Sequence, residues 1–454
     1  MAVSTHTFQA PKGTRDFYPH DLAVRRYIES VWREVSINHG FDEIDGPTFE
    51  HLDLYTAKSG PDIESELFSF TRSGGDTKYA LRPEFTPTLA RMYAAHAGSL
   101  AKPTKWFSIG PYFRAERPQR GRLREHIQLN VDIIGDDSPR ADAEMIAVAV
   151  RLLEALGLSS ETLKIRLSDR NLIADILSFI GVHEEREFEA LRILDQLTKR
   201  RIEDIREDAR RIDLDIDWFL KLAKELSDDF SRGEIPTEFI EDALEGRKKI
   251  VTPLRFDHLC ALTDELDNRG ITEWCTLDLS IVRGLAYYTG TVFEIHETAG
   301  KERAIAGGGR YDNLVELFGG PPTPACGFAM GDVVLRLVLE DHRLLKPAEQ
   351  YMPLPDVFVI DLREQDSQGH FSALVSELRS AGLHVRHSYK ATRNVGKLLS
   401  EANKARARFA VILGKELDEG NVVLKDLRSG EQEEIARESL IEVLRTKLAT
   451  CEEG

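Results

Sequence analysis

The chain has 454 residues, of which 42% are hydrophobic and 30% charged, as in soluble globular proteins with two or three domains. Its net charge of −17 argues against non-specific binding of nucleic acid over the whole surface, and leaves only local basic footprints. The four cysteines show no CxxC spacing, so we expect no disulfide framework, no structural metal site and a reducing, cytoplasmic location. We also expect no membrane span and no secretory leader, because no apolar run approaches about 20 residues.

The first predicted elements are a helix and an interrupted strand. Residues 21–39 place apolar side chains at helical spacing, and Gly40 suits the position just after the helix. The next segment, FDEIDGPTFE, predicts a strand that is broken at Gly46-Pro47. Both elements fit either a core or a dimer contact.

Residues 78–96 predict a strand that passes into a helix. Thr86 is a good N-cap, and Pro87 suits the first helical position. Glu84 and Thr86 then lie at the carboxyl end of the strand. One interpretation makes them a solvated carboxylate and a helix cap, and the other makes them site residues.

The stretch that organises the chain runs from Tyr112 to Gly135. Five arginines and one glutamate lie between positions 114 and 124, and within this segment a predicted loop over 117–122 leads into a strand of strict alternation from Arg124. One face of this strand is apolar and the other carries Arg124, His126, Gln128, Asn130 and Asp132. A solvated hairpin would explain the loop, but the polar row favours a site for phosphates or nucleic acid, whose oxygens guanidinium groups bind in pairs.

A short strand at 163–168 is followed by helices rich in both charge signs, which predict an all-helical insertion over 171–249. Its charges are typical of solvated faces, and a nucleic-acid contact is the alternative. Sheet-like sequence resumes around Arg283, which stands alone among apolar and aromatic residues. A buried guanidinium needs an anionic partner, either a salt bridge or a substrate. The glycine triplet 307–309 fits close packing or close approach to a ligand.

The final unit follows a proline-containing linker and alternates strands with helices, which predicts an α/β domain over 355–454. Between Arg379 and Arg408 lie eight Lys and Arg residues and one acidic residue. In a strongly acidic chain this segment predicts a footprint for a phosphate backbone, with a solvated basic face as the alternative.

These segments resemble the histidyl-tRNA synthetases, a family of class II aminoacyl-tRNA synthetases. FRAERPQRGRLREHIQLNVD resembles class II motif 2, the helix at 21–39 with FDEIDGPTFE resembles motif 1, and PKGTRDFYP is similar to the start of the family. RGLAYYTGTVFE and GGGRYDNL resemble the two histidine-specific segments, and the final unit is similar to the family's anticodon-binding domain.

The resemblance implies an α+β catalytic domain over 1–170 and 250–345, with an antiparallel sheet of six or seven strands. It implies a homodimer formed through motif 1, and the helical insertion and the anticodon-binding domain would complete the chain. The activity would be that of a histidine–tRNA ligase with ATP and Mg²⁺ as cofactors and with L-histidine and tRNA(His) as partners.

The resemblance also assigns site residues. Arg114 and Arg283 would be catalytic, on either side of the α-phosphate, where preorganised guanidiniums stabilise developing charge. The residues that would contact histidine are Glu84, Thr86, Gln128, Asp132, Tyr287 and Tyr288. ATP would be bound by Arg114 and Arg283 together with Glu116, Arg122 and Arg124. The tRNA acceptor end would be contacted by Gln119 and Arg120.

The sequence departs from the family pattern at several positions. Asp132, Ala286 and Asn130 replace the more usual glutamate, aspartate and glycine. Motif 3 usually ends in Glu-Arg, and this chain has Val333-Val334 instead. Arg336, two helical positions further on, faces elsewhere. These departures keep a second reading open, a catalytically silent histidine-sensing paralogue similar to the regulatory subunit of ATP phosphoribosyltransferase.

Overall fold

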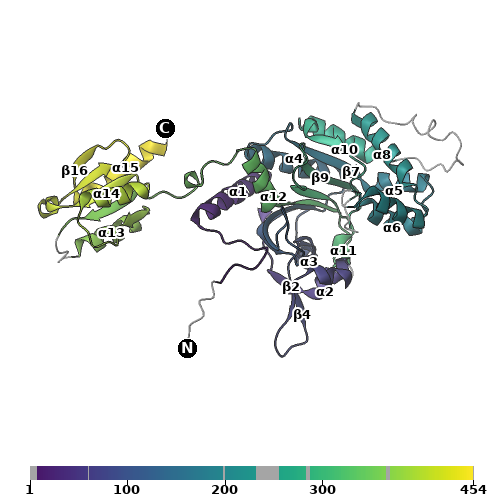
Figure 1. Cartoon of the computed structure of the whole chain (residues 1–454), viewed down its shortest axis with the longest axis horizontal. Helices are drawn as coiled ribbons and strands as arrows, with labels where there is room; N and C mark the ends of the chain where they lie inside the picture. The colour runs from purple at the N-terminus through teal and green to yellow at the C-terminus, as the bar shows by residue number, and fades with distance from the viewer. Residues whose placement is uncertain are drawn as a thin grey trace. The chain divides into compact units, whose positions relative to one another are not determined.

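The chain divides into two compact units, Met1–Gln350 and Tyr351–Gly454, which are described separately (Figure 1). The structure is a computed structural model that describes residues 8–59, 61–197, 200–231, 255–282, 287–363 and 369–452. No helix within these ranges combines the length and the apolar character that a membrane crossing requires.

The larger unit is built on a sheet with eight described strands. In spatial order they are β1 (Asp42–Glu43), β5 (Thr104–Phe113), β6 (Glu125–Ile134), β11 (Ala325–Gly331), β10 (Ala306–Arg310), β9 (Thr291–Glu297), β7 (Leu163–Asp169) and β8 (Cys275–Leu277). The inner pairs are antiparallel, but β1 runs parallel to β5 and β8 parallel to β7. The expected antiparallel sheet of six or seven strands is confirmed by the six inner strands, and one short parallel strand is added at each edge. Each edge strand is separated from its neighbour by a long connection, which parallel pairing requires.

Helices cover one face of this sheet. The long helix α4 (Pro139–Ala155) packs on β6 and β11, and α1 and α10 pack against α4 (Figure 1). On the other face α3 and α11 pack over part of the sheet, and the pockets described below lie over strands β6, β10 and β11. The other helices of this unit are α1 (Pro19–Asn38), α2 (Leu52–Ser59), α3 (Thr86–His96), α5 (Arg170–Phe179), α6 (Glu184–Leu194), α7 (Ile202–Arg211), α8 (Ile216–Ser231), α10 (Asp257–Asn268), α11 (Leu314–Leu317) and α12 (Asp332–Asp341).

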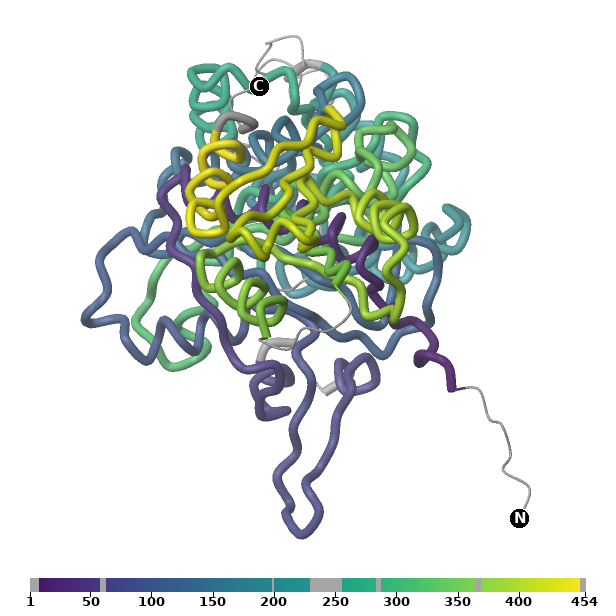
Figure 2. The backbone as a smooth tube through the Cα atoms, turned by 90° about the vertical axis from the view of Figure 1, so that its left-hand side faces the viewer, coloured from purple at the N-terminus to yellow at the C-terminus, as the bar shows by residue number. Residues whose placement is uncertain are grey.

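The predicted start of the chain is confirmed. Helix α1 ends at Asn38, and Gly40 follows with a φ of +76°, a conformation that glycine adopts without strain. The predicted strand is broken at Gly46-Pro47 into β1 and β2 (Phe49–His51). Strand β2 joins β4 (Lys78–Leu81) and β3 (Ser69–Thr71) in a small second sheet, and Figure 2 shows the β3–β4 hairpin extending away from the rest of this unit.

The charged helices of the predicted insertion pair their charges with one another. Arg206 binds Asp217 at 2.8 Å and Arg200 binds Asp208 at 2.7 Å. The expectation of solvated charged faces fits these exposed pairs. The boundaries 171–249 stay a prediction, since residues 232–254 lie outside the described ranges.

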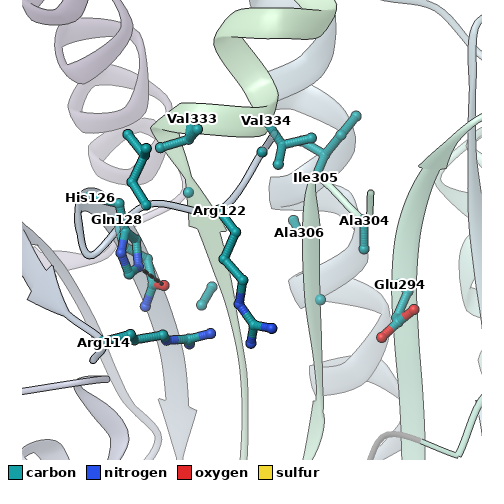
Figure 3. A pocket seen from close by; sticks show the side chains of 15 residues that line it. Arg114, Arg122, His126, Gln128, Glu294, Ala304, Ile305, Ala306, Val333 and Val334 are labelled. Carbon is teal, nitrogen blue, oxygen red and sulfur yellow. Dashed lines mark hydrogen bonds between the residues drawn. The ribbon is translucent and has the colours of Figure 1, made fainter. Parts of the chain in front are cut away.

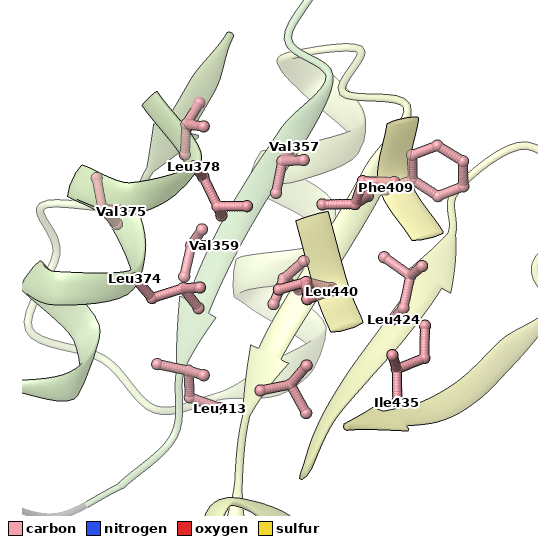
Figure 4. Packing of buried hydrophobic residues seen from close by; sticks show 14 residues of the cluster. Val357, Val359, Leu374, Val375, Leu378, Phe409, Leu413, Leu424, Ile435 and Leu440 are labelled. Carbon is pink, nitrogen blue, oxygen red and sulfur yellow. The ribbon is translucent and has the colours of Figure 1, made fainter. Parts of the chain in front are cut away.

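The smaller unit is an α/β domain, as the alternation of its sequence predicts. Its sheet has the order β13 (Val385–His387), β12 (Val357–Asp361), β14 (Phe409–Leu413), β15 (Asn421–Asp426), β16 (Gln432–Ala436). Figure 4 shows apolar side chains of α13 (His370–Ser380) and α15 (Leu440–Glu452) packed on one face, where Leu374, Leu378 and Leu440 are fully buried. On the other face α14 (Val395–Lys404) covers Phe358 and Ala410. Short 3₁₀ turns occur at Pro61–Glu66, Thr272–Trp274, Ala348–Gln350, Lys415–Glu419 and Arg437–Ser439.

Candidate active site

Two adjoining cavities lie over strands β6, β10 and β11 of the larger unit. The larger cavity has a volume of about 210 Å³ and the smaller one about 70 Å³. Both are lined by Arg114, Gln128, Gly307 and Ala329, so they are two parts of one site that meet at the Arg114 guanidinium.

The smaller cavity brings together all six residues expected to contact histidine. They come from three distant segments of the sequence, and Asn130 and Tyr311 complete the polar wall. The six are Glu84, Thr86, Gln128, Asp132, Tyr287 and Tyr288. A cavity of this size lined by carboxylates, hydroxyls and amides can bind a small, polar, cationic molecule.

The polar row of β6 forms the floor of both cavities. Gln128, Asn130 and Asp132 are 4–7% exposed, so both faces of this strand are buried. The Gln128 amide donates to Asn130 Oδ1 at 2.9 Å, and the Asn130 amide donates to Tyr112 Oη at 3.0 Å. This chain of hydrogen bonds fixes the orientation of each amide before a ligand arrives.

His126 continues the row into the larger cavity. Its Nε2 lies 3.3 Å from Gln128 Oε1. Burial, followed by the positive charge of Arg114, lowers the pKa of His126 to about 4. The imidazole is therefore neutral near pH 7, and adds no charge to the site.

Asp132 is the acid of the row, and it is 5% exposed. Burial raises the pKa of its carboxyl to about 7, and the hydrogen bond that the Tyr311 hydroxyl donates to Oδ1 opposes this rise. Gly327 on β11 makes room for the pair, because a Cβ there would lie 2.2 Å from Asp132 Oδ1. Tyr311 was missed as a site residue by sequence reasoning, although it stands in the GGGRYD segment.

Thr86 does not cap a helix. It is the first residue of α3, Phe85 occupies the N-cap position in a helical conformation, and no side-chain cap hydrogen bond is formed. The capping prediction is wrong because the chain enters the helix one residue earlier than the sequence suggests. The Thr86 side chain lines the smaller cavity instead.

The arginines of the hairpin separate into two groups. Arg114 and Arg122 line the larger cavity, and Figure 3 shows their guanidiniums within it. Arg122 is held by Glu116 through a hydrogen bond of 2.6 Å. Neither Glu116 nor Arg124 is among the residues that line the two cavities, and Arg124 Nε lies 3.3 Å from the Glu116 carbonyl oxygen.

The tip of the hairpin is closed by backbone hydrogen bonds between Gln119 and Arg122. Gln119 and Arg120 both lie outside the cavity walls. The Arg120 guanidinium forms an ion pair with Glu302 at 2.5 Å, and this pair ties the hairpin to the loop before β10.

The N-terminal segment braces the site from outside. The Gly13 carbonyl accepts the backbone N–H of Arg124 at 2.8 Å. Arg15 binds Asp332 at 2.7 Å, and Asp332 in turn accepts the N–H of Ile127 at 2.9 Å. The start of α12 is thereby attached to β6.

A buried arginine, Arg82, is the second residue that sequence reasoning missed. Arg82 is 1% exposed, donates to the Pro111 carbonyl at 2.9 Å and lies 4.8 Å from the centre of the Tyr112 ring. Gly110 permits this approach, because a Cβ there would lie 2.2 Å from the guanidinium. Arg82 thus supports the tyrosine at which the hydrogen-bond chain of β6 ends.

The far end of the larger cavity is apolar. Val333 and Val334 line it where the resemblance places Glu-Arg, together with Ile305 (Figure 3). Arg336 points away, as its helical position predicts, and pairs with Asp21 at 3.2 Å and Glu340 at 2.8 Å. Arg283 lies outside the described residues.

In the smaller unit, the expected basic footprint is reduced by internal contacts. Arg408 pairs with Asp426 at 2.8 Å, and Lys390 with Glu401 at 3.0 Å. The exposed basic residues that remain candidates for a phosphate backbone are Arg386, Lys397, Lys404 and Arg406.

Comparisons with known proteins agree with this geometry. The model of the histidyl-tRNA synthetase family matches residues 13–332, and that of an anticodon-binding domain matches residues 356–447. Histidine–tRNA ligases of Opitutus terrae and Haloarcula marismortui are 39% and 37% identical, and their alignments cover 98% and 94% of this chain and 99% and 95% of theirs. A crystal structure of histidyl-tRNA synthetase from Nostoc has a TM-score of 0.72 at 25% identity, over 98% of this chain and 100% of that one.

Proposed function

The chain belongs to the histidyl-tRNA synthetase family and is an ATP-dependent histidine–tRNA ligase, and on that premise we propose how its residues divide the reaction between the two cavities. The observation that carries the proposal is that six expected histidine contacts converge on the smaller cavity, directly beside the arginines of the larger one.

Histidine binds in the smaller cavity. Asp132 and the Tyr287–Tyr288 pair face the imidazole, and Glu84, Thr86 and Gln128 receive the ammonium group. An amino acid without polar groups on its side chain would leave the buried Asp132 and Tyr311 without a ligand partner, which is the basis of strong discrimination.

ATP binds in the larger cavity, with its phosphates between Arg114 and Arg122 and its base toward Val333 and Ile305. Glu116 acts on the nucleotide by orienting Arg122, and Arg124 by fixing the hairpin backbone.

The described residues contain no cluster of three metal ligands, but Glu294 lines this cavity. One carboxylate plus phosphate oxygens suits Mg²⁺ that arrives with ATP, and the ion would neutralise charge on the departing pyrophosphate.

The first reaction is attack of the histidine carboxylate on the α-phosphorus, which releases pyrophosphate. Arg114 lines both cavities, so its guanidinium can follow the negative charge as it moves to the non-bridging oxygens. Arg283 is proposed on the opposite side of the phosphate. In the second reaction, a terminal ribose hydroxyl of the tRNA attacks the activated carbonyl carbon and AMP leaves.

The tRNA is proposed to contact both units. Gln119 and Arg120 at the hairpin tip would meet its acceptor end, because Arg120 keeps donors that Glu302 does not use. The exposed basic residues of the smaller unit would bind the backbone near the anticodon.

Replacing Arg386, Lys397 and Lys404 by alanine should raise the KM for tRNA and lower the salt dependence of binding, with a slope reduced by about 0.7–0.9 per contact. Arg151→Ala, an exposed arginine on α4, is the control; equal effects would contradict the footprint.

A homodimer is proposed through the region that resembles motif 1. Phe49 and Phe70 are 49% and 43% exposed on the small sheet, with ring centres 5.8 Å apart. An exposed aromatic patch of this kind suits burial against a second copy. Phe49→Glu should shift the chain to monomers in analytical ultracentrifugation; a monomeric wild type would contradict the proposal.

A cytoplasmic location is also proposed, and the free thiols of Cys260, Cys275 and Cys326 fit a reducing compartment.

Exchange of pyrophosphate into ATP tests the proposed function. We expect exchange with histidine and none with the other common amino acids, because only histidine fills the smaller cavity. Histidine binding without exchange would instead favour the silent histidine sensor. The matched anticodon-binding domain and the curated ligases already favour the enzyme over that reading.

A further inference from the structure

We propose that Arg303 is a nucleotide-binding residue that covers the base of ATP at the apolar end of the larger cavity. The proposal rests on the assignment of this cavity to ATP. Arg303 would supply a cation at the apolar end of the larger cavity, which Val333 and Val334 line.

The apolar end needs a partner for one face of the base. If the phosphates lie at Arg114 and Arg122, the base lies toward Ile305, Val333 and Val334, all of which line the cavity. Aliphatic side chains exclude water from a ring but leave its π face without an electrostatic partner. A planar guanidinium stacks on such a face.

Arg303 lies beside Gly121, a residue that lines this cavity. A Cβ built on Gly121 would lie 3.3 Å from Cγ2 of Val334 and 3.7 Å from Cδ of Arg303, so the two side chains flank the same glycine. The next two residues, Ala304 and Ile305, line the cavity. The stem of Arg303 therefore runs between the hairpin tip and the start of α12.

Its guanidinium is also uncommitted. Arg303 is exposed and forms no ion pair or hydrogen bond with another described residue. The neighbouring arginines are engaged: Arg122 by Glu116 and Arg15 by Asp332. Arg336, the nearest arginine along α12, is held by Asp21 and Glu340.

The loop that carries Arg303 is held in place. Glu302 has a side chain that is 3% exposed and binds Arg120 of the hairpin tip at 2.5 Å. This ion pair fixes the backbone beside Arg303 while the Arg303 side chain stays exposed. Because the loop is already ordered, binding of a ligand would have to order only the Arg303 side chain. Val334 complements it, since a longer side chain there would compete for the space beside Gly121.

The test compares Arg303→Ala and Arg303→Lys with Arg336→Ala, an arginine of the same region that points away from the cavity. We expect Arg303→Ala to weaken binding of ATP and of AMP by about 3- to 30-fold, the range of a cation–π contact, and to leave binding of tripolyphosphate unchanged. Arg303→Lys should recover only part of the affinity, because it keeps the charge and loses the planar face. Arg336→Ala should bind all three ligands normally.

Calorimetry on the full chain separates this inference from the proposed function, since it reads ATP affinity without turnover. Wild-type affinity for ATP in Arg303→Ala would overturn the inference. A loss confined to tripolyphosphate would overturn it as well, because it would place the guanidinium on the phosphates. Absence of histidine-dependent exchange in a wild type that binds ATP would instead contradict the proposed function.

Discussion

The two cavities are built on different principles. The smaller one is walled by buried polar side chains of strands and their ends, which already bind one another, as Gln128 does with Asn130 and Tyr311 with Asp132. The larger one combines aliphatic residues with Arg114 and Arg122, and Arg122 is held by the acidic partner Glu116. If histidine and ATP bind as proposed, selection of the amino acid depends mainly on buried side chains that already bind one another, whereas binding of the nucleotide depends also on arginines of the hairpin.

Loss of Arg114 should have the largest effect, because Arg114 lines both cavities. Arg114→Ala is expected to lower kcat for pyrophosphate exchange by about 10²- to 10³-fold, the effect of removing one preorganised donor from a developing anion. The control Arg151→Ala should exchange normally. A normal kcat in a folded Arg114→Ala protein would remove Arg114 from the reaction.

Asp132→Asn should affect only the smaller cavity. The substitution keeps the shape, removes the charge and replaces one carboxyl oxygen by an amide donor, while the remaining oxygen can still accept from Tyr311, so the KM for histidine should rise by about 10- to 100-fold while the KM for ATP changes little. Steady-state exchange kinetics with each substrate varied measure the separation. Parallel increases in both KM values would show that the cavities are not independent.

Asp132 should also make stability depend on pH. Its pKa is raised to about 7 in the folded chain, so folding favours the protonated carboxyl, and the benefit is lost as pH rises through about 7. The unliganded wild type should therefore lose Tm relative to Asp132→Asn between about pH 5 and pH 8. A difference in Tm between the two proteins that stays constant over this pH range would contradict the burial of a titrating acid.

Thr86→Ala should give the smallest effect, and separates a structural from a binding role. A lost N-cap would cost about 1 kcal/mol of stability, but Thr86 makes no cap hydrogen bond, so we expect an unchanged Tm. The KM for histidine should rise by about 3- to 10-fold, as for one lost neutral hydrogen bond. A lower Tm with an unchanged KM would restore the capping interpretation.

Strand periodicity allowed the sequence to predict the floor of the site, because side chains alternate along β6 whatever surrounds them. The α/β class of the smaller unit was predicted from its alternation of strand-like and helix-like segments. Contacts between distant segments could not be predicted in this way. Glu302, far along the chain, decides that Arg120 is held at the hairpin tip, and the Phe85 backbone decides that Thr86 faces the cavity. Arg82 and Tyr311 were missed for the same reason, since neither lies in a periodic segment.

A non-hydrolysable analogue of histidyl-adenylate tests most directly whether the two cavities form one active site. The analogue links the ligand of the smaller cavity to that of the larger one across Arg114, so it should bind about 10²- to 10⁴-fold more tightly than histidine or ATP alone. Arg114→Ala should lose most of this gain. An analogue that binds no more tightly than its separate halves would contradict the account.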